Sequence, residues 1–397
     1  MNDKRFTQSP FPEIRLSADD RANLVRIADA LVRANLNEYQ QHLNRGKKVD
    51  LTRWKRVCNS GTTTTYLERS RPLNSSSAKL PASLMVGPLP GTLEENMFGL
   101  VSPTLESTRI KTSYLNDISA AAVLATIVEP TSETPLRSVV VKWMEIDIPG
   151  ASLGVVRNRD YVYLESCGIC QLDDGERIGY HLFHSVSFPQ AHELPSRVRG
   201  NMSFCGIFRQ EGHDRTDCRG TGIMDPGGDA ARVMAIMGMV QATMAGLKYS
   251  YCGRMKKLAW LLEQRQLEAK DRLALIEERQ VCVTCLKQIK GHKKSRMYVR
   301  NASCTCELCF GCLCGTCKIL KKLTFVPIDG QLRQRKVSFC VQCLVEATSI
   351  DTLEAAREQF VYKKAVHSSG KASSSTASGN SSSSDGVLSS SLIPYDS

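Results

Sequence analysis

Two stretches of the chain decide the fold: SVVVKWMEI at residues 138–146 and RDYVYLESCGIC at residues 159–170. Both are short runs rich in β-branched and aromatic residues, and the second leads into the turn cluster LDDGER at 172–177. Similar β-rich runs recur between about residues 50 and 210. We therefore expect an antiparallel sheet over that part of the chain.

The sequence predicts one helix before the sheet region in the chain and two helical stretches after it. Residues 18–45 repeat apolar side chains near helical spacing, and Ser17 and Asp20 are placed as a capping pair. Residues 229–252 should form one long helix with a wide apolar face, and residues 254–280 a helical connector. The apolar positions are Leu24, Ile27, Ala28, Leu31, Leu36 and Leu43 in the first helix, and Val233, Ile236, Met237, Val240, Met244, Leu247 and Tyr251 in the second. The fold class is therefore α+β.

The apolar face of the 229–252 helix has two interpretations. It can pack on the sheet as an ordinary core, or it can line a ligand site. Its four methionines, Met234, Met237, Met239 and Met244, are compatible with an adaptable lining, because methionine fills irregular space without a fixed shape. Periodicity alone does not separate the two.

Several stretches resemble START lipid-binding domains, in the version fused to FYVE-type zinc fingers in water-mould proteins. They are VDLTRWKRV (49–57), TYLERS (65–70), RDYVYLES (159–166), DDGERIGYHLFHSVSFP (173–189) and RVRGNMSFCGIFR (197–209), with the following helix. The resemblance covers most of residues 45–255. It implies a helix-grip fold, in which a curved antiparallel sheet wraps around a long C-terminal helix and an apolar tunnel holds one lipid or sterol.

No group of residues in this region suggests catalysis, so we expect a protein that is not an enzyme. The scattered histidines have no convincing nucleophile partner; they are His181, His184, His192 and His213. Cys167 and Cys170 form a CxxC pair in a strand-like context, for which buried packing is favoured over a redox or metal role.

The cysteines are concentrated near the C-terminus. Ten of the sixteen lie between residues 282 and 343, and eight of these form four CxxC pairs: Cys282/Cys285, Cys306/Cys309, Cys314/Cys317 and Cys340/Cys343. A structural zinc ion takes four ligands, so four pairs predict two Zn²⁺ ions in a small zinc finger. The N-terminal stretch lacks the apolar run of a secretory signal, and no run approaches the roughly 20 residues that span a bilayer. A cytoplasmic location, where thiolates on metal are favoured over disulfides, is expected.

Two ligand registers are open for the finger. The FYVE resemblance implies a cross-brace, in which the first CxxC pair shares a zinc with the third and the second with the fourth, leaving Cys304 and Cys312 unused. A RING-like register would use those two cysteines and leave out Cys314 and Cys317. The first is preferred because the START resemblance independently predicts it.

Positive charge gathers in the same segment. Between Cys282 and Cys343, twelve Lys and Arg residues face only Glu307 and Asp329, which accounts for +10 of the net +12. Such a field predicts an anionic partner, either a membrane that includes phosphoinositides or a protein. A nucleic acid is not favoured, because no base-reading pattern is evident.

The membrane contact is expected at one short stretch. Basic side chains there flank the apolar step Met297, Tyr298 and Val299; they are Lys293, Lys294, Arg296 and Arg300. The alternative is that the apolar step forms a buried strand. The sequences before Cys282, Cys306 and Cys340 depart from the FYVE lipid-binding motifs, which argues against specific recognition of phosphatidylinositol 3-phosphate.

The expected divisions are 1–45, an N-terminal segment with the amphipathic helix; 46–253, the START-like domain; 254–280, the connector; 281–346, the FYVE-related cross-brace finger; and 347–397, a C-terminal segment ending in a disordered serine-rich tail. Together they predict a lipid-binding adaptor that is cytoplasmic and peripheral on endosomal or other internal membranes. The alternative is a RING-like ubiquitin ligase with the START-like domain as substrate or lipid sensor.

Overall fold

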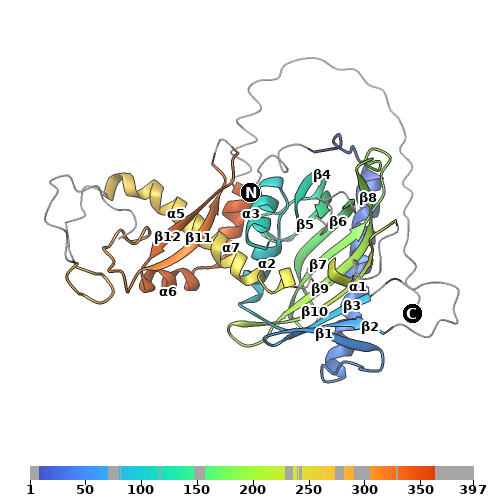
Figure 1. The fold of residues 1–397 in the computed structure, drawn as a ribbon, viewed down its shortest axis with the longest axis horizontal. Helices are drawn as coiled ribbons and strands as arrows, with labels where there is room; N and C mark the ends of the chain where they lie inside the picture. Colours follow the sequence, from blue (N-terminus) through green and yellow to red (C-terminus); the bar gives the residue numbers. More distant parts are fainter. Residues whose placement is uncertain are drawn as a thin grey trace, which may run out of the picture.

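The computed structural model describes residues 9–69, 80, 82–115, 118–146, 157–228, 236–238, 240, 244–272, 281–289, 305–327 and 330–362. These residues form a sheet domain and a narrower cysteine-rich module, which Figure 1 shows on the left of the sheet. The expected membrane-contact stretch 293–300, Cys304 and the serine-rich tail lie outside the described residues.

The sheet is antiparallel, as predicted. Its order is β1 (Trp54–Ser60), β2 (Thr63–Glu68), β3 (Ala82–Pro90), β10 (Arg215–Asp225), β9 (Asn201–Gln210), β7 (Arg177–Ser185), β6 (Asn158–Gln171), β5 (Ser138–Ile146) and β4 (Ala120–Val128). A short strand, β8 (Arg197–Arg199), adds a parallel pairing to β6. The two stretches that predicted the sheet are neighbours, with Val141 opposite Leu164. The predicted LDDGER turn joins β6 to β7, and Gly175 there adopts a φ of 84°.

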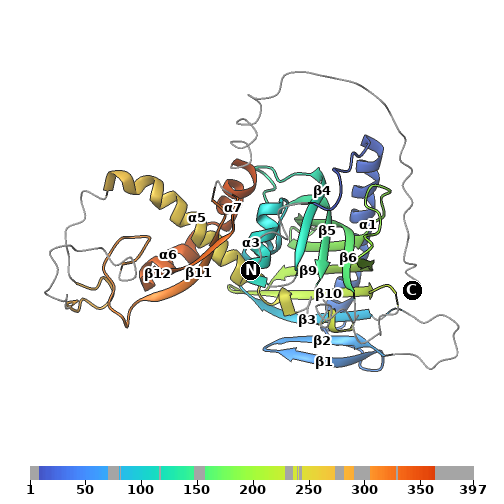
Figure 2. The ribbon, with the colours of Figure 1, turned by 45° about the horizontal axis from the view of Figure 1, so that its top comes forward.

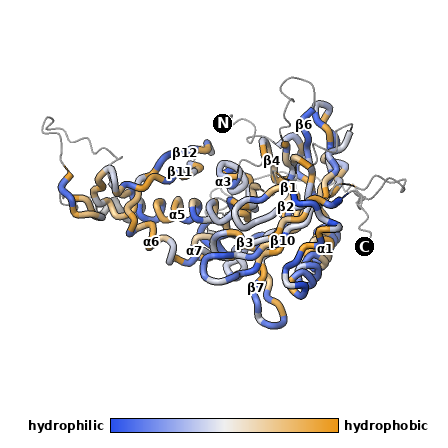
Figure 3. The backbone as a smooth tube through the Cα atoms, turned by 60° about the horizontal axis from the view of Figure 1, so that its bottom comes forward, coloured by the Kyte–Doolittle hydropathy of each residue, from blue (hydrophilic) through white to orange (hydrophobic). Residues whose placement is uncertain are grey.

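Helix α1 (Ala18–Asn44) covers one face of this sheet. It begins with the predicted capping box of Ser17 and Asp20, and it buries Leu24 and Ala28 among strand residues. The hydroxyl of Tyr39 donates to the Asp217 carboxylate at 2.6 Å. Figure 3 shows the mixed hydropathy expected of a helix with one buried face. The division expected after residue 45 therefore falls inside one packed unit.

Two glycines set a close helix crossing at one end of the sheet. There α2 (Leu93–Leu100) crosses α5 (Tyr249–Arg272). A Cβ atom on Gly253 would lie 2.1 Å from the Glu95 carbonyl oxygen, and one on Gly99 would lie 1.9 Å from that of Tyr249. Only glycine at these two positions permits the approach. A further helix, α3 (Leu105–Leu115), leads into β4.

The prediction of one helix over 229–252 was wrong. Described residues in 236–246 are helical, but the chain turns at Leu247 and Lys248, just after Gly246, before α5 begins at Tyr249. Glycine weakens a helix interior, which favours an end there. Helix α5 then passes without interruption through the boundary expected at 253/254.

The methionines expected to line a ligand site on that helix do not do so in the described part. Met237 and Met244 are 54% and 38% exposed. Met234 and Met239 lie outside the described residues.

The expected connector is helical as far as Arg272, but it is not a spacer. Met255, Leu258 and Leu262 of α5 are buried against the cysteine module, which contains the hairpin of β11 (Ile319–Phe325) and β12 (Arg333–Phe339) and helix α6 (Val341–Ser349). Figure 2 shows the hairpin running beside α5. The module is thus packed onto the sheet domain.

The C-terminal segment returns to the sheet domain after α6. Helix α7 (Thr352–Arg357) and the π-helical turn η5 (Glu358–Tyr362) pack on α2, where Phe360 lies against Phe98. No helix in the described ranges is long and apolar enough to span a bilayer.

Candidate functional sites: an apolar cavity and two cysteine tetrads

A cavity of about 140 Å³ lies on the face of the sheet opposite α1. Three residues from the part of the chain that follows the sheet also line the cavity. They are Ala245, Gly246 and Tyr249, the last of which is the first residue of α5. Its large apolar lining residues are Met85, Ile118, Met144, Ile146, Phe183, Met202, Phe204, Phe208 and Met224. All but Ile118 come from strands, so the methionines in the described lining belong to the sheet.

The cavity lining also includes a lysine and a histidine that share one buried carboxylate. They are Lys111 and His181, and both contact the buried carboxylate of Glu165, at 3.7 Å and 2.9 Å. Lys142, also buried, pairs with the other oxygen of Glu165 and donates to Ser102. Burial alone would raise the pKa of Glu165, but Lys142 and Lys111 outweigh it and leave its pKa lowered. Burial lowers the pKa of His181. A fixed carboxylate therefore holds cationic and imidazole groups at the cavity wall.

This cluster was not predicted from the sequence, in which His181 is one of several scattered histidines. A signal was present in the two stretches that decide the fold. Lys142 stands between apolar residues in the first stretch, and Glu165 follows a run of apolar and aromatic residues in the second. A lone charge in a buried strand needs a partner, and adjacent strands supply one.

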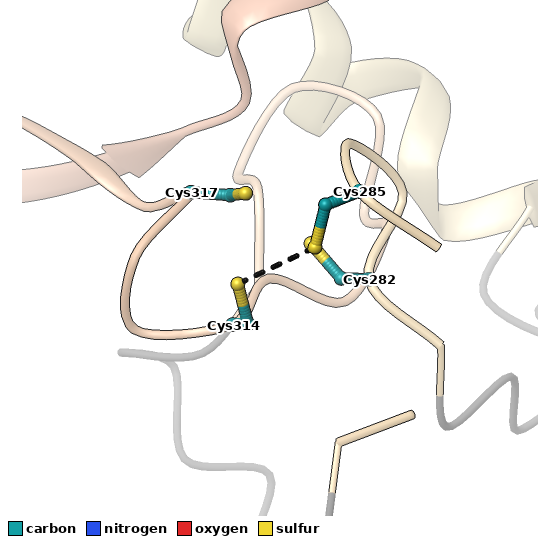
Figure 4. Close-up of side chains that lie close together, drawn as sticks. All are labelled: Cys282, Cys285, Cys314 and Cys317. Carbon is teal, nitrogen blue, oxygen red and sulfur yellow. Dashed lines mark hydrogen bonds between the residues drawn. The ribbon is translucent and has the colours of Figure 1, made fainter. Parts of the chain in front are cut away.

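The eight cysteines of the four CxxC pairs gather into two tetrads. Cys282, Cys285, Cys314 and Cys317 form one, shown in Figure 4, and Cys306, Cys309, Cys340 and Cys343 form the other. Within each tetrad the sulfur atoms all lie within 4.8 Å of one another. The first pair thus meets the third and the second meets the fourth.

The spacing of the sulfurs fits a tetrahedral metal ion. Four thiolates about 2.3 Å from zinc would stand roughly 3.8 Å apart. The Sγ atoms of Cys285 and Cys314 are 3.7 Å apart, and those of Cys309 and Cys340 are 3.9 Å apart. Each tetrad could therefore hold a metal ion.

The first two CxxC pairs lie in loops of the same shape. In each, the residue after the second cysteine has a left-handed backbone, with a φ of 59° at Leu286 and 60° at Phe310. Its amide donates back to the carbonyl of the first cysteine. Non-glycine residues seldom adopt this conformation, so its recurrence at equivalent positions indicates one loop geometry that turns both cysteines toward a common point.

The RING-like register disagrees with this arrangement. It leaves out Cys314 and Cys317, which the structure places in the first tetrad. Cys312, which it requires, is half-buried outside both tetrads, and its carbonyl accepts a hydrogen bond from Val283.

The other CxxC pair, in β6, does not form a shared site. Cys167 is fully buried in the cluster that contains α2, whereas Cys170 packs on the cluster that contains α1. Residues three apart on a strand point to opposite faces, so the two thiols cannot bind one ion. The packing interpretation fits the structure.

No family model and no curated protein matches this chain. Among solved structures, human StAR-related lipid transfer protein 5 is similar at 13% identity and a TM-score of 0.40, over 59% of this chain and 98% of its own. Human STARD10 is similar at 14% identity and 0.36, over 52% and 78%. A STAR-related lipid transfer protein from Xanthomonas axonopodis is similar at 16% and 0.35, over 50% and 96%. The fold is a START-like helix-grip fold, as expected, with its large antiparallel sheet and C-terminal helix.

Proposed function

We propose that this chain is a lipid-binding adaptor without enzymatic activity. Its cavity holds one apolar lipid or sterol, and its FYVE-related module holds two zinc ions and contacts an anionic membrane or a protein partner. The observation that carries the proposal is the cavity, whose lining combines apolar side chains from the strands with Lys111 and His181. An amphipathic ligand matches both kinds of lining.

The size of the cavity limits how the ligand sits. About 140 Å³ admits a group the size of a benzene ring, so a whole lipid requires the lining to move. The four lining methionines, Met85, Met144, Met202 and Met224, can change rotamer to enlarge the space.

Native mass spectrometry on the full chain tests the ligand. The expected spectrum shows two zinc ions and a lipid-sized adduct. Met224→Trp fills the cavity and should remove the adduct while both metals remain. Met237→Trp makes the same change at an exposed methionine and should keep it. Two zinc ions with no adduct in the wild-type protein, and no uptake of added sterol or phospholipid, would overturn the lipid proposal.

Zinc is proposed because four thiolates in a tetrahedral set suit it best among common cytosolic metals. The ions would be structural, since four protein ligands leave no open position for chemistry. Zinc analysis of protein purified without chelators should give two equivalents. Iron bound in place of zinc, or a stably folded module without metal in its tetrads, would contradict the assignment.

The anionic partner is proposed from unpaired charge on the hairpin. Lys322 lies directly opposite Lys336 in the β11–β12 register, and within the described ranges neither has an acidic partner. Like charges at this position repel, so an anion between them would be stabilising. Phosphoinositide-bearing endosomal or other internal membranes are the proposed source.

Liposome pelleting tests the membrane contact. Binding should rise with the content of anionic lipid and fall with salt. Exchange of the two lysines that face each other, in Lys322→Gln with Lys336→Gln, should weaken it. Equal binding to zwitterionic and anionic vesicles would overturn the membrane proposal and leave a protein partner for the module.

A further inference from the structure

The cysteine module contacts two helices, α3 and α5, that each contribute a residue to the cavity lining. We propose that metal binding in the tetrads and ligand binding in the cavity are coupled, with the module acting as a brace on α3 and α5. The inference rests on the proposed function for the identity of the two ligands. Its structural basis lies in contacts that neither site explains alone.

Helix α5 touches both sites. Its first residue, Tyr249, lines the cavity, and Leu262 is buried in the cluster that contains Cys282, Cys306 and Cys340. At 1.5 Å per residue the helix joins them over about 20 Å without a break. A rigid helix anchored at both ends transmits a shift of one end to the other.

Helix α3 makes the second connection. Its Lys111 lines the cavity, while neighbouring residues on the same helix bind the β11–β12 hairpin. The Ser113 and Thr324 hydroxyl oxygens are 2.8 Å apart, the Thr324 amide donates to the Tyr114 hydroxyl at 2.7 Å, and Gln334 donates to the Ser113 carbonyl at 3.2 Å. A guanidinium nitrogen of Arg109 also donates to the Gly330 carbonyl at 2.6 Å. The β11–β12 hairpin is therefore hydrogen-bonded to α3, the helix that contributes Lys111 to the cavity lining.

The hairpin in turn depends on both tetrads. Strand β11 begins two residues after Cys317 of the first tetrad, and β12 runs directly into Cys340 of the second. Loss of metal would free both ends of the hairpin at once. The module has only a small apolar core to hold it otherwise, and such modules commonly need metal to fold.

Coupling between two sites is reciprocal. If metal steadies α3 and the start of α5, removal of metal weakens ligand binding, and bound ligand raises the affinity for metal by the same factor. Coupled sites commonly change each other's affinity by roughly 5- to 150-fold, so we expect an effect of about tenfold.

Hydrogen-exchange mass spectrometry on the full chain tests the brace without any lipid. Protein with zinc is compared with protein stripped by a chelator. Peptides from α3 and from residues 249–258 should lose protection on stripping, while α1, on the opposite face of the sheet, keeps it. Loss of protection confined to residues 281–349 would overturn the inference.

Ligand affinity gives the second readout, with dehydroergosterol and a pyrene-labelled phosphatidylcholine as probes. Binding to the zinc-loaded chain and about tenfold weaker binding to the stripped chain support the coupling. Equal affinity in both forms overturns it and leaves the proposed function standing. If neither probe binds the loaded chain, the function fails for these ligands, and hydrogen exchange still decides the brace.

A milder variant separates the contact from the metal. Thr324→Val removes the hydroxyl that meets Ser113 but no cysteine and no cavity residue, so it should keep two metals yet loosen α3 in hydrogen exchange. Thr348→Val makes the same change on α6, where the hydroxyl meets only the backbone of its own helix. Identical α3 protection in both variants would contradict the proposal.

Discussion

The sheet domain buries large apolar clusters on both faces of its 10-stranded sheet, with α1 on one side and the cavity on the other. The cysteine module has a much smaller core of its own, with Leu308, Leu313, Leu323, Val337 and Phe339 buried beside the tetrad sulfurs. Hydrophobic burial can support the first part alone, whereas the second needs its metals and the face of α5. The difference predicts that the two parts fail under different treatments.

The largest expected effect is loss of a buried tetrad cysteine. Cys306→Ser should remove the second metal and unfold the module, because apparent binding energies for structural zinc are about 10–16 kcal/mol. The sheet domain should keep its far-ultraviolet circular dichroism and α1 its protection from hydrogen exchange. Metal counting and hydrogen exchange measure both parts in one sample.

Cys312→Ser is the matched control for that change. Cys312 lies in the same module but outside both tetrads, so two metals should remain. Loss of one zinc in this variant would reverse the assignment of ligands and restore the RING-like register.

The second effect lies in the sheet domain. Glu165→Gln leaves Lys142 and Lys111 buried without their carboxylate, and breaking a buried ion pair from one side costs about 3–5 kcal/mol. Denaturant unfolding followed on the sheet domain should show this loss while zinc content stays at two. Glu176→Gln, at a half-exposed pair with Arg209, should cost at most about 1 kcal/mol. Equal effects would mean that the cluster at the cavity wall is not held by charge.

Features encoded locally were predictable from the sequence. Runs of β-branched and aromatic residues between turn clusters predicted the antiparallel sheet, and the Ser17 and Asp20 capping box predicted the start of α1. Each of these patterns is complete within a few residues. The grouping of the cysteines into two tetrads was different, because the CxxC spacing allowed a second register and the neighbouring START resemblance decided between them.

Features that depend on distant partners were not predictable. Phe360 packs against Phe98 and the buried ammonium of Lys256, and no pattern in the sequence around Phe360 predicts these contacts. A lysine in a helix is usually expected at the surface, but Lys111 of α3 is buried beside Glu165. The close crossing of α2 and α5 at Gly99 and Gly253 also joins segments far apart in the sequence and was not predicted.

The third effect tests that crossing, where the two parts share α5. Gly253→Ala places a methyl group 2.1 Å from the Glu95 carbonyl, and the forced separation of α2 and α5 should cost about 1–3 kcal/mol. Gly246→Ala, whose new methyl group meets its nearest neighbour at 3.5 Å, should change stability by no more than about 0.5 kcal/mol. Thermal melting of the two variants compares them directly. A Gly253→Ala protein as stable as the Gly246→Ala protein would show that α2 and α5 have room to separate.

The smallest effect is a dependence on pH that belongs to the sheet domain. Burial lowers the pKa of His181, so between its folded pKa and the unfolded value of about 6.5 the unfolded chain binds the extra proton. Stability should therefore be full above about pH 6.5 and fall below it, by up to about 1.4 kcal/mol per pH unit for one histidine. Burial also lowers the pKa of His42 and His184, which adds to the same trend.

His181→Gln isolates the contribution of the cavity histidine, since the amide can still donate to Glu165. Denaturant unfolding of the sheet domain between pH 5 and 7 should show a shallower slope for this variant than for the wild type. His213→Gln, at an exposed turn, should keep the wild-type slope. Metal loss at low pH also weakens the protein, but through the cysteine module and equally in all three chains. A slope unchanged in His181→Gln would mean that folding does not shift the pKa of His181, which would contradict the burial of a neutral imidazole at the cavity wall.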